Sequence, residues 1–306
     1  MINKIIVLGP TASGKTDLSI DLAKEIDGEI ISVDSRQCYK YLNIGTAKPS
    51  AKQLNSVKHY NISVLEPGQK DSAENFRKRT EAYIKKIQTK HKKPIYAGGS
   101  TLHLRAVIQP FDKIPGANKE NLEMLGRRLD EQGSEVLLRE LREVDPEYAN
   151  QMDGFNRQRV LRALDIYMQT GEPFSSFHSD EPVEPSDDMI VIGLHYPRDI
   201  LYDRINRRVD KMLESGLVEE TKTILELGYS KDLQALQTVG YRQVIEYLDG
   251  NLSREQMVRD IKTKTRRYAK RQLTWFRRWP FIKWLNAHEM TNMQLTDSVK
   301  QMVAGK

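Results

Sequence analysis

The first chemistry that the sequence offers is phosphate binding at a short glycine-containing segment. It fits the pattern G-x-x-x-x-G-K-[ST] at every position and consists of Gly9, Pro10, Thr11, Ala12, Ser13, Gly14, Lys15 and Thr16. Glycines let successive backbone N–H groups face one anion, and the start of the following helix adds its positive dipole end. Lys15 supplies a cation, and the Thr16 hydroxyl suits a Mg²⁺ ligand. The segment therefore predicts a bound phosphate or diphosphate and leaves its carrier open.

A carboxylate and three polar side chains come directly after the second apolar run of the chain. They are Asp34, Ser35, Arg36 and Gln37. In an open parallel sheet, ligands lie beyond the carboxyl ends of the strands, so Asp34 is expected to face the same crevice as the phosphate segment. Asp34 could bind magnesium, act as a general base, or cap the next segment. The other three side chains suit hydrogen bonds to a base edge or a phosphate.

A third run ends in small residues, Gly98 and Gly99, followed by Ser100 and Thr101. Glycines at this place let a ligand come close to the backbone. Ser100 or Thr101 would then place a hydroxyl in the crevice. A plain strand-to-helix turn is the alternative interpretation of this segment.

Four short apolar runs, rich in Ile and Val and bounded by Gly, Pro or Asp, are predicted as buried strands. They cover residues 4–8, 29–33, 94–97 and 189–194. Helical patterns at 15–26 and 72–89 lie between them, and this alternation favours a parallel sheet with helices on both faces. Together with the phosphate segment, it predicts an α/β fold of the P-loop NTPase type.

The stretch 115–188 differs from this pattern because it contains no convincing strand. Helical spacing appears at 121–130, 135–143 and 156–169, and both edges of the stretch are rich in turn residues. We therefore predict an inserted all-helical domain at 115–188 within a core formed by 1–114 and 189–306. Beyond residue 197 the chain is predicted to be helical at 200–213, 218–227, 243–248 and 253–278, with Pro280 ending the last helix.

Composition and charge exclude several classes of protein. The chain has 306 residues, no apolar window long enough to span a membrane and no secretory signal, so we expect a cytoplasmic protein. Its one cysteine, Cys38, excludes an intramolecular disulfide and a cysteine-rich zinc site. The net charge is +6, but residues 262–283 hold nine Lys or Arg and no acid, which leaves 39 basic and 42 acidic residues elsewhere. This local basicity indicates a polyanion-binding surface.

Several motifs together resemble the tRNA isopentenyltransferase family over nearly the whole chain, roughly residues 4–280. The phosphate segment and the segment 34–39 are followed by Ile-Gly-Thr-Ala-Lys-Pro at 44–49 and Gly-Gly-Ser-Thr-Leu at 98–102. Asn-Arg-Gln-Arg-Val-Leu-Arg-Ala-Leu at 156–164, Gly-Tyr-Arg-Gln at 240–243 and Arg-Tyr-Ala-Lys-Arg-Gln-Leu-Thr-Trp-Phe at 267–276 complete the set. The resemblance is to the bacterial type without a zinc finger.

The resemblance implies transfer of a dimethylallyl group from dimethylallyl diphosphate to N6 of adenosine-37, in tRNAs reading codons that begin with U. The phosphate segment would hold the diphosphate, with Mg²⁺ on Thr16 as the cofactor. Asp34 would be the general base, and Ser100 would help to hold the target amine. The tRNA anticodon stem-loop would contact Asp34, Ser35, Arg36, Gln37, Ser100, Gln158, Arg159, Val160, Leu161 and Arg162. We expect a monomer.

Two arginines are candidates for further neutralisation of the diphosphate. Arg204 and Arg208 are four residues apart, so they share a helix face, and both match arginine positions of the family. Arg207 is expected to point elsewhere. The alternative is a solvated basic face paired with Asp203 and Asp210.

The sequence departs from the family pattern at Ser100, Thr101 and His103, where Thr, Gly and Tyr are usual. The turn at 46–48 is taken as part of the crevice wall. In the basic segment 262–283 the cations are expected to contact RNA, whereas Trp275 and Trp279 are expected to pack against the core. The competing functions are a P-loop nucleoside or nucleotide kinase, prenylation of free adenine nucleotide, and a non-catalytic RNA-binding NTPase module.

Overall fold

The computed structural model describes residues 2–109, 114–177 and 183–305. The chain divides into two compact units: unit 1 is Met1–Gln109 with Val183–Lys306, and unit 2 is Pro110–Pro182. Residues 110–113 and 178–182, close to the predicted domain edges, lie outside the described residues. The division therefore falls a few residues before each of the edges expected from the sequence.

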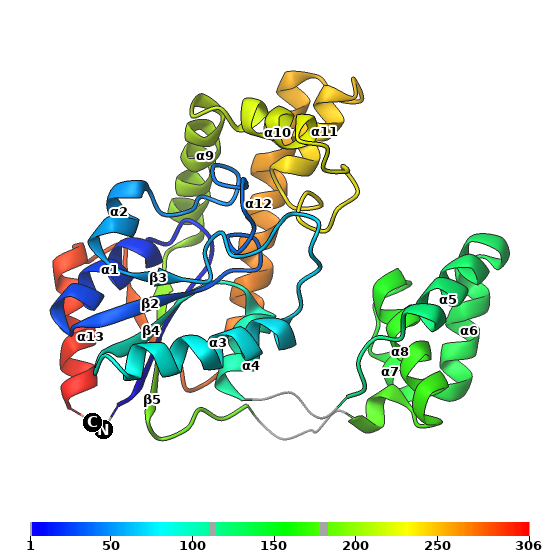
Figure 1. The fold of residues 1–306 in the computed structure, drawn as a ribbon, viewed down its shortest axis with the longest axis horizontal. Helices are drawn as coiled ribbons and strands as arrows, with labels where there is room; N and C mark the ends of the chain where they lie inside the picture. Colours follow the sequence, from blue (N-terminus) through cyan, green and yellow to red (C-terminus); the bar gives the residue numbers. More distant parts are fainter. Residues whose placement is uncertain (1, 110–113, 178–182, 306) are drawn as a thin grey trace. The chain divides into compact units, whose positions relative to one another are not determined.

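Unit 1 is built on one sheet of six parallel strands in the order β3-β2-β4-β1-β5-β6 (Figure 1). The strands are β1 (Lys4–Leu8), β2 (Gly28–Val33), β3 (His59–Tyr60), β4 (Lys93–Gly98), β5 (Met189–His195) and β6 (Lys283–Asn286). This arrangement confirms the predicted α/β class. The three strands with functional motifs at their carboxyl ends, β2, β4 and β1, are neighbours, so those motifs meet at one edge.

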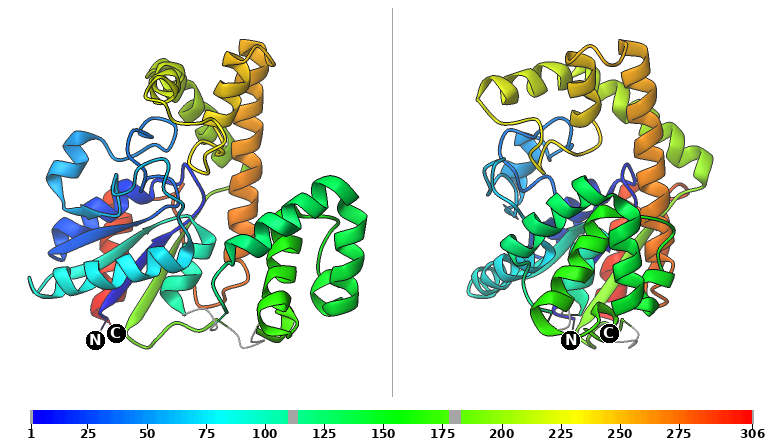
Figure 2. Two further views of the ribbon diagram at one scale, coloured as in Figure 1. Left: turned by 45° about the vertical axis from the view of Figure 1, so that its right-hand side comes forward. Right: turned by 90° about the vertical axis from the view of Figure 1, so that its right-hand side faces the viewer.

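Helices cover both faces of this sheet (Figures 1 and 2). Those of unit 1 are α1 (Lys15–Glu25), α2 (Ala51–Ser56), α3 (Ala73–Gln88), α4 (Thr101–Ile108), α9 (Arg198–Glu214), α10 (Leu217–Glu226), α11 (Tyr241–Leu248), α12 (Arg254–Phe276) and α13 (Asn292–Ala304). Side chains of β1 alternate between the faces: Ile5 and Val7 pack in one apolar cluster, Ile6 and Leu8 in another. Burial on both faces explains why the central strands are continuous apolar runs.

A third apolar cluster joins α9, α10, α11 and α12 to the chain that follows β2. Leu217, Tyr241 and Ile261 belong to this cluster and are almost fully buried, together with Tyr39 and Leu42 of the connection after β2. The cluster thereby attaches a helical group to the same edge of the sheet that carries the motifs.

Unit 2 is helical throughout its described part, residues 114–177, as expected. It contains α5 (Lys119–Gln132), α6 (Ser134–Val144), α7 (Pro146–Asn150), α8 (Arg157–Thr170) and a 3₁₀ turn (Phe174–Phe177). Leu125, Leu137, Leu141, Val160 and Leu164 form its own core. Asn118 and Asn156 begin α5 and α8 by accepting backbone N–H groups.

The main differences from the sequence-based expectation are short or peripheral elements. Strands β3 and β6, and helices α2, α4, α7 and α13, were not predicted. Strands β3 and β6 lie at the two edges of the sheet, where partial exposure removes the continuous apolar run that identifies a central strand. Among the described residues, no helix combines the length and apolar character needed to span a bilayer.

Candidate active site

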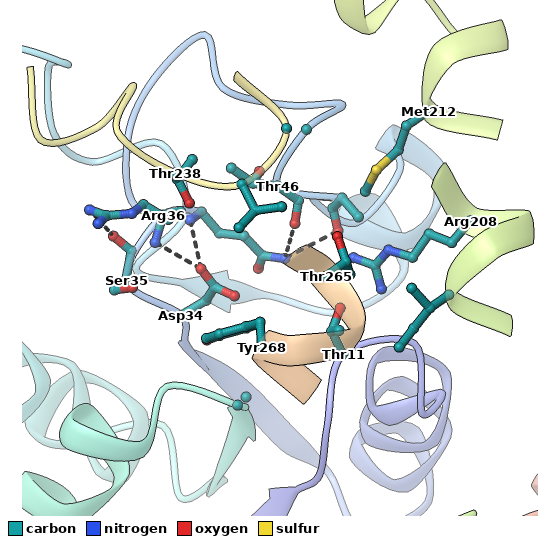
Figure 3. Close-up of a pocket in the computed structure, with 18 of the residues that line it drawn as sticks. Thr11, Asp34, Ser35, Arg36, Thr46, Arg208, Met212, Thr238, Thr265 and Tyr268 are labelled. Carbon is teal, nitrogen blue, oxygen red and sulfur yellow. Dashed lines mark hydrogen bonds between the residues drawn. The ribbon is translucent and has the colours of Figure 1, made fainter. Parts of the chain in front are cut away.

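A cavity of about 260 Å³ lies at the carboxyl ends of β1, β2 and β4 (Figure 3). It is lined by the phosphate loop, the turn after β2, the loop after β4, and helices α9 and α12. The loop at 45–47 and the segment 238–240 complete its wall. The structure therefore brings together motifs that are separated by most of the chain.

The phosphate loop connects β1 to α1 and contributes Thr11, Lys15 and Thr16 to the cavity. Gly14 begins α1 with φ 85°, a backbone conformation that residues with a side chain rarely adopt. The start of α1 thus faces the cavity with the positive end of its dipole, which is the arrangement expected for an anion site.

Lys15 is folded back onto its own loop. Its Nζ donates to the Pro10 carbonyl at 2.6 Å and lies 3.4 Å from the Ser13 hydroxyl. Burial, together with the nearby charge of Arg208, lowers the pKa of Lys15 to about 7, against the opposing effect of Asp34. An anion in the cavity would favour the protonated amine and reverse this effect.

Asp34 is held by an Asx turn at the end of β2. Its Oδ1 accepts the backbone N–H groups of Arg36 at 2.7 Å and Gln37 at 3.1 Å (Figure 3). Its Oδ2 has no hydrogen-bond partner among the described residues, although the side chain lines the cavity. Asp34 therefore caps the turn with one oxygen and retains a second oxygen for chemistry.

The three residues after Asp34 line the cavity, but their side chains differ in how many hydrogen bonds they make within the protein. Gln37 donates from Nε2 to the carbonyls of Thr46 and Ala47, and its Oε1 accepts from the Ser32 hydroxyl. Its amide thus holds the loop at 45–47 in this structure, and a contact of its side chain with RNA stays a prediction. The Arg36 guanidinium makes one contact, a 3.5 Å bond to the Ser35 carbonyl, and remains available.

Cys38 lies directly below this turn and is fully buried. Its Sγ lies 3.6 Å from the Ser35 carbonyl, and burial, reinforced by the charge of Asp71, raises the pKa of the thiol to about 12. The thiol is therefore protonated and inaccessible at ordinary pH.

The loop that closes the cavity on one side is held by Glu220 of α10. The Glu220 carboxylate accepts the N–H groups of Asn43 at 3.0 Å, Ile44 at 2.9 Å and Gly45 at 3.3 Å. The Tyr241 hydroxyl donates to the same carboxylate at 2.5 Å. This clamp places Gly45, Thr46 and Ala47 in the cavity wall. Of the turn predicted at 46–48, residues 46 and 47 line the cavity, whereas Lys48 lines a separate groove.

Helix α9 presents one face to the cavity, at the spacing i, i+3, i+4, i+7. This face consists of Ile205, Arg208, Val209 and Met212. In Figure 3, Arg208 and Asp34 reach into the cavity from opposite sides of the view. The wall thus combines a cation with apolar side chains.

Arg204 does not line the same cavity as Arg208, and whether it reaches the diphosphate stays a prediction. Its Nε donates to the Ala12 carbonyl at 2.8 Å, its guanidinium lies over the Tyr196 ring, and it lines a separate groove behind the phosphate loop. One turn of α9 separates the two arginines. Arg204 thus supports the phosphate loop through the Ala12 carbonyl. Arg207 does not line the cavity, as expected; it is exposed and paired with Asp203, the pairing that the alternative interpretation named.

Helix α12 contributes a second face, which sequence reasoning missed. Ile261, Thr265, Tyr268 and Gln272 are spaced by four, three and four residues and line the cavity. The prediction for this segment was based on its cations, which do not line the cavity. Five of them are exposed: Arg267, Lys270, Arg271, Arg277 and Arg278. The signal available in the sequence was the glutamine, Gln272, at the same helical spacing as Ile261, Thr265 and Tyr268. Trp279 is buried in the core and Trp275 packs beside it, as expected.

Ser100 stands one residue beyond the cavity lining. Its N–H donates to the Val33 carbonyl at 3.2 Å, which keeps it beside Asp34 in the chain fold. Its hydroxyl lies 2.8 Å from His103 Nδ1, so it is turned to α4 in this structure. Burial lowers the pKa of His103 to about 4, so the imidazole is neutral and only weakly basic at neutral pH.

The donor set around Thr16 suits a magnesium ion only when phosphate oxygens are present. No group of three or more His, Cys, Asp or Glu side chains that could hold a metal occurs in the described part of the chain. Thr16 and Asp34 supply two oxygens to the same cavity. Mg²⁺ commonly uses one or two protein oxygens, substrate phosphates and water, so these residues fit that mode.

In unit 2, the predicted RNA-contact stretch divides into exposed and buried positions. Gln158 and Arg159 are exposed on α8, whereas Val160 and Leu161 are buried in the core of the unit. Arg162 donates to Asp165 at 2.6 Å and to the Pro115 carbonyl. Burial removes the side chains of Val160 and Leu161 from any surface that RNA could touch. The predicted RNA contacts in this stretch are therefore limited to Gln158, Arg159 and Arg162.

Comparison with known proteins places these features in one family. The model of the IPP transferase family matches residues 37–279. A tRNA dimethylallyltransferase of a Thermoanaerobacter species is 42% identical over 311 aligned residues, which cover 100% of this chain and 98% of the relative.

Two solved structures are also similar. The tRNA delta(2)-isopentenylpyrophosphate transferase of Staphylococcus epidermidis has 36% identity, a TM-score of 0.73 and full coverage of both chains. A eukaryotic dimethylallyltransferase described as acting on tRNA has 25% identity and a TM-score of 0.82, covering 99% of this chain and 80% of its own. On the extent of these matches, the chain belongs to the IPP transferase family.

Proposed function

We propose that this protein transfers the dimethylallyl group of dimethylallyl diphosphate to N6 of adenosine-37 in tRNAs that read codons beginning with U. The observation that carries the proposal is the composition of one cavity. Lys15, Arg208 and the start of α1 provide an anion site, Val209 and Met212 provide an apolar wall, and Asp34 provides a carboxylate oxygen without a partner. A diphosphate, a five-carbon apolar group and a nucleophilic amine require these three features.

Departure of the diphosphate is the first chemical demand. The C1–O bond of the allylic diphosphate breaks readily because the developing carbocation is delocalised, provided that the leaving charge is stabilised. Arg208 and the start of the phosphate-loop helix line the cavity, so they are suited to stabilise this charge. Protonated Lys15 adds a further charge as the anion raises its pKa.

Formation of the new C1–N6 bond makes the exocyclic amine acidic, and its proton must then leave. The free oxygen of Asp34 is suited to accept this proton, while the hydrogen bonds to its other oxygen keep the carboxylate oriented. Bound Mg²⁺, held by diphosphate oxygens and Thr16, would supply additional neutralisation of the leaving group.

The adenine amine cannot reach this cavity while the base is stacked in the anticodon loop, so the nucleotide must be flipped out of the stack. Arg36 beside the cavity, the exposed cations of α12, and Gln158 and Arg159 of unit 2 suit contacts with the loop and stem. We infer that these surfaces hold the anticodon stem-loop.

A transfer assay tests this function. The protein is incubated with Mg²⁺, radiolabelled dimethylallyl diphosphate and an unmodified tRNA with adenosine at position 37. Parallel reactions contain free AMP in place of the tRNA, or ATP with a nucleoside. A matched tRNA with guanosine at position 37 is the control. Label in the first tRNA alone supports the proposal, whereas label in AMP moves the activity to free nucleotides. Phosphate transfer from ATP to a nucleoside, without any prenyl transfer, would establish a kinase instead.

A further inference from the structure

Gln272 connects two loops of the cavity that follow different strands. It belongs to α12, and its side chain is only 3% exposed. Its Oε1 accepts the N–H of Thr11 at 2.9 Å, and its Nε2 donates to the Gly99 carbonyl at 2.7 Å. Thr11 lies in the phosphate loop after β1, and Gly99 in the loop after β4, so one amide spans both.

The contact is closely fitted on the side of Gly99. A Cβ atom added at Gly99 would lie 2.4 Å from Gln272 Nε2 and 3.0 Å from the Gly9 carbonyl oxygen. A side chain at position 99 would therefore displace the Gln272 amide from its present position. A buried amide with both of its ends bonded to backbone has one orientation, which makes it a rigid spacer.

In the proposed reaction, one loop binds the leaving diphosphate and the other is bonded next to the base, Asp34. The phosphate loop holds the leaving group. The loop after β4 continues into Ser100, whose N–H is bonded to the Val33 carbonyl immediately before Asp34. A change in the separation of the loops would therefore change the separation of the diphosphate from the base. Transfer between bound reactants is sensitive to displacements of about 1 Å, because reacting atoms must approach to roughly 3–3.5 Å in line.

We propose that Gln272 is a positioning residue for the transfer reaction: its amide sets the spacing between the phosphate loop and the loop after β4. This inference rests on the proposed function and adds a residue that does not itself touch the reacting atoms. It predicts a loss in the rate of the chemical step with little loss in the affinity for the anion.

Two variants separate this role from a merely structural one. Gln272→Met preserves the length and burial of the side chain and removes both hydrogen bonds. Gln272→Glu keeps an acceptor for Thr11 but, when ionised, cannot donate to Gly99; its protonated form can do both. Thr296→Val is the control, since it removes another buried polar group, 4% exposed and bonded to the Asn292 carbonyl in α13, away from the cavity.

The measurements are kcat for transfer to tRNA, the Kd for inorganic pyrophosphate with Mg²⁺, and the midpoint of urea unfolding. For Gln272→Met we expect kcat to fall at least tenfold, with a pyrophosphate Kd within threefold of wild type. For Gln272→Glu we expect the ratio of its kcat to that of wild type to rise several-fold between pH 8 and pH 6, because burial favours the protonated carboxyl that restores the second bond.

The proposal is overturned if the kcat of Gln272→Met stays within threefold of Thr296→Val. It is equally overturned if pyrophosphate affinity falls in proportion to kcat, since Gln272 would then be part of the anion site and not a spacer. Failure of the proposed function is distinguishable, because in that case the wild-type chain itself would label no tRNA.

Discussion

At the scale of single residues, Asp34 divides its tasks between two oxygens. Oδ1 stabilises the turn after β2, whereas Oδ2 has no hydrogen-bond partner among the described residues and is the oxygen that we propose as the base. The sequence leaves three roles open for this residue, and the structure shows that capping and an available base are compatible. Either role alone would have been an incomplete interpretation.

Asp34→Asn is the variant that separates these tasks. The amide oxygen of Asn can still accept both backbone N–H groups, so the turn should remain folded, while the basic oxygen is lost. We expect single-turnover transfer to fall by about 10²–10⁴-fold with pyrophosphate affinity nearly unchanged. Activity close to that of wild type would remove Asp34 as the base.

Lys15 gives a proton-linkage prediction. Its pKa is about 7 in the free protein, so at pH 8 most molecules carry a neutral amine at this position. A bound diphosphate raises this pKa, so binding should take up as much as one proton per site at pH 8 and less at pH 6, where the amine is already charged. Calorimetric titration with pyrophosphate in buffers of different ionisation enthalpy measures this uptake.

Pyrophosphate also exchanges protons of its own, so the comparison is with Lys15→Met under identical conditions. We expect the variant to take up fewer protons than the wild-type protein when pyrophosphate binds at pH 8. Equal uptake by the two proteins would show that Lys15 does not change its protonation state when the ligand binds.

At the scale of elements, the structure separates what local pattern predicts from what packing decides. The central strands and the phosphate loop were predictable because continuous apolar runs and fixed glycine spacing are local signals. The edge strands β3 and β6 lacked such a signal. The role of Gln272 was also hidden, since its partner Thr11 lies 261 residues away in the sequence.

The clamp between α10 and the loop at 43–45 yields a prediction about an element. Glu220→Gln retains one oxygen for three N–H donors and loses the charge that strengthens these bonds. We expect unfolding free energy to fall by about 1–3 kcal/mol. KM for dimethylallyl diphosphate should rise, because the clamped loop forms part of the cavity wall.

Glu219→Gln is the matched control for this clamp. Glu219 is the preceding residue and is exposed. Denaturant unfolding and steady-state kinetics on both variants check the prediction. If Glu219→Gln and Glu220→Gln behave alike, the clamp has no influence on the cavity.

At the scale of the whole molecule, the chain consists of a sheet-based unit and an inserted helical unit. The insertion was predictable because strand-like runs cease after the third of them and resume at residue 189. The exposed residues of this unit were harder to predict, because the motif at 158–162 does not distinguish exposed from buried positions. Only the packing of α8 against its neighbours shows that Val160 and Leu161 face inward.

Arg159→Ala tests the contribution of unit 2 to recognition. Arg159 is exposed at the start of α8, so its loss should leave the fold intact and weaken tRNA binding about tenfold at 0.1 M salt, with a shallower salt dependence. Pyrophosphate affinity should stay unchanged. Arg139→Ala, an exposed arginine on α6, serves as control, and an equal effect of both would indicate unspecific attraction.

The burial of Cys38 has a practical consequence for measuring these units in solution. Its thiol is inaccessible and held protonated, so maleimide reagents should leave the native chain unlabelled. All three tryptophans lie at 275, 279 and 284, in unit 1, and unit 2 contains none. One cysteine introduced on the exposed side of α6 would therefore accept a dye at a single place. Resonance energy transfer from the tryptophans to that dye would report how far apart the two units are, with and without tRNA.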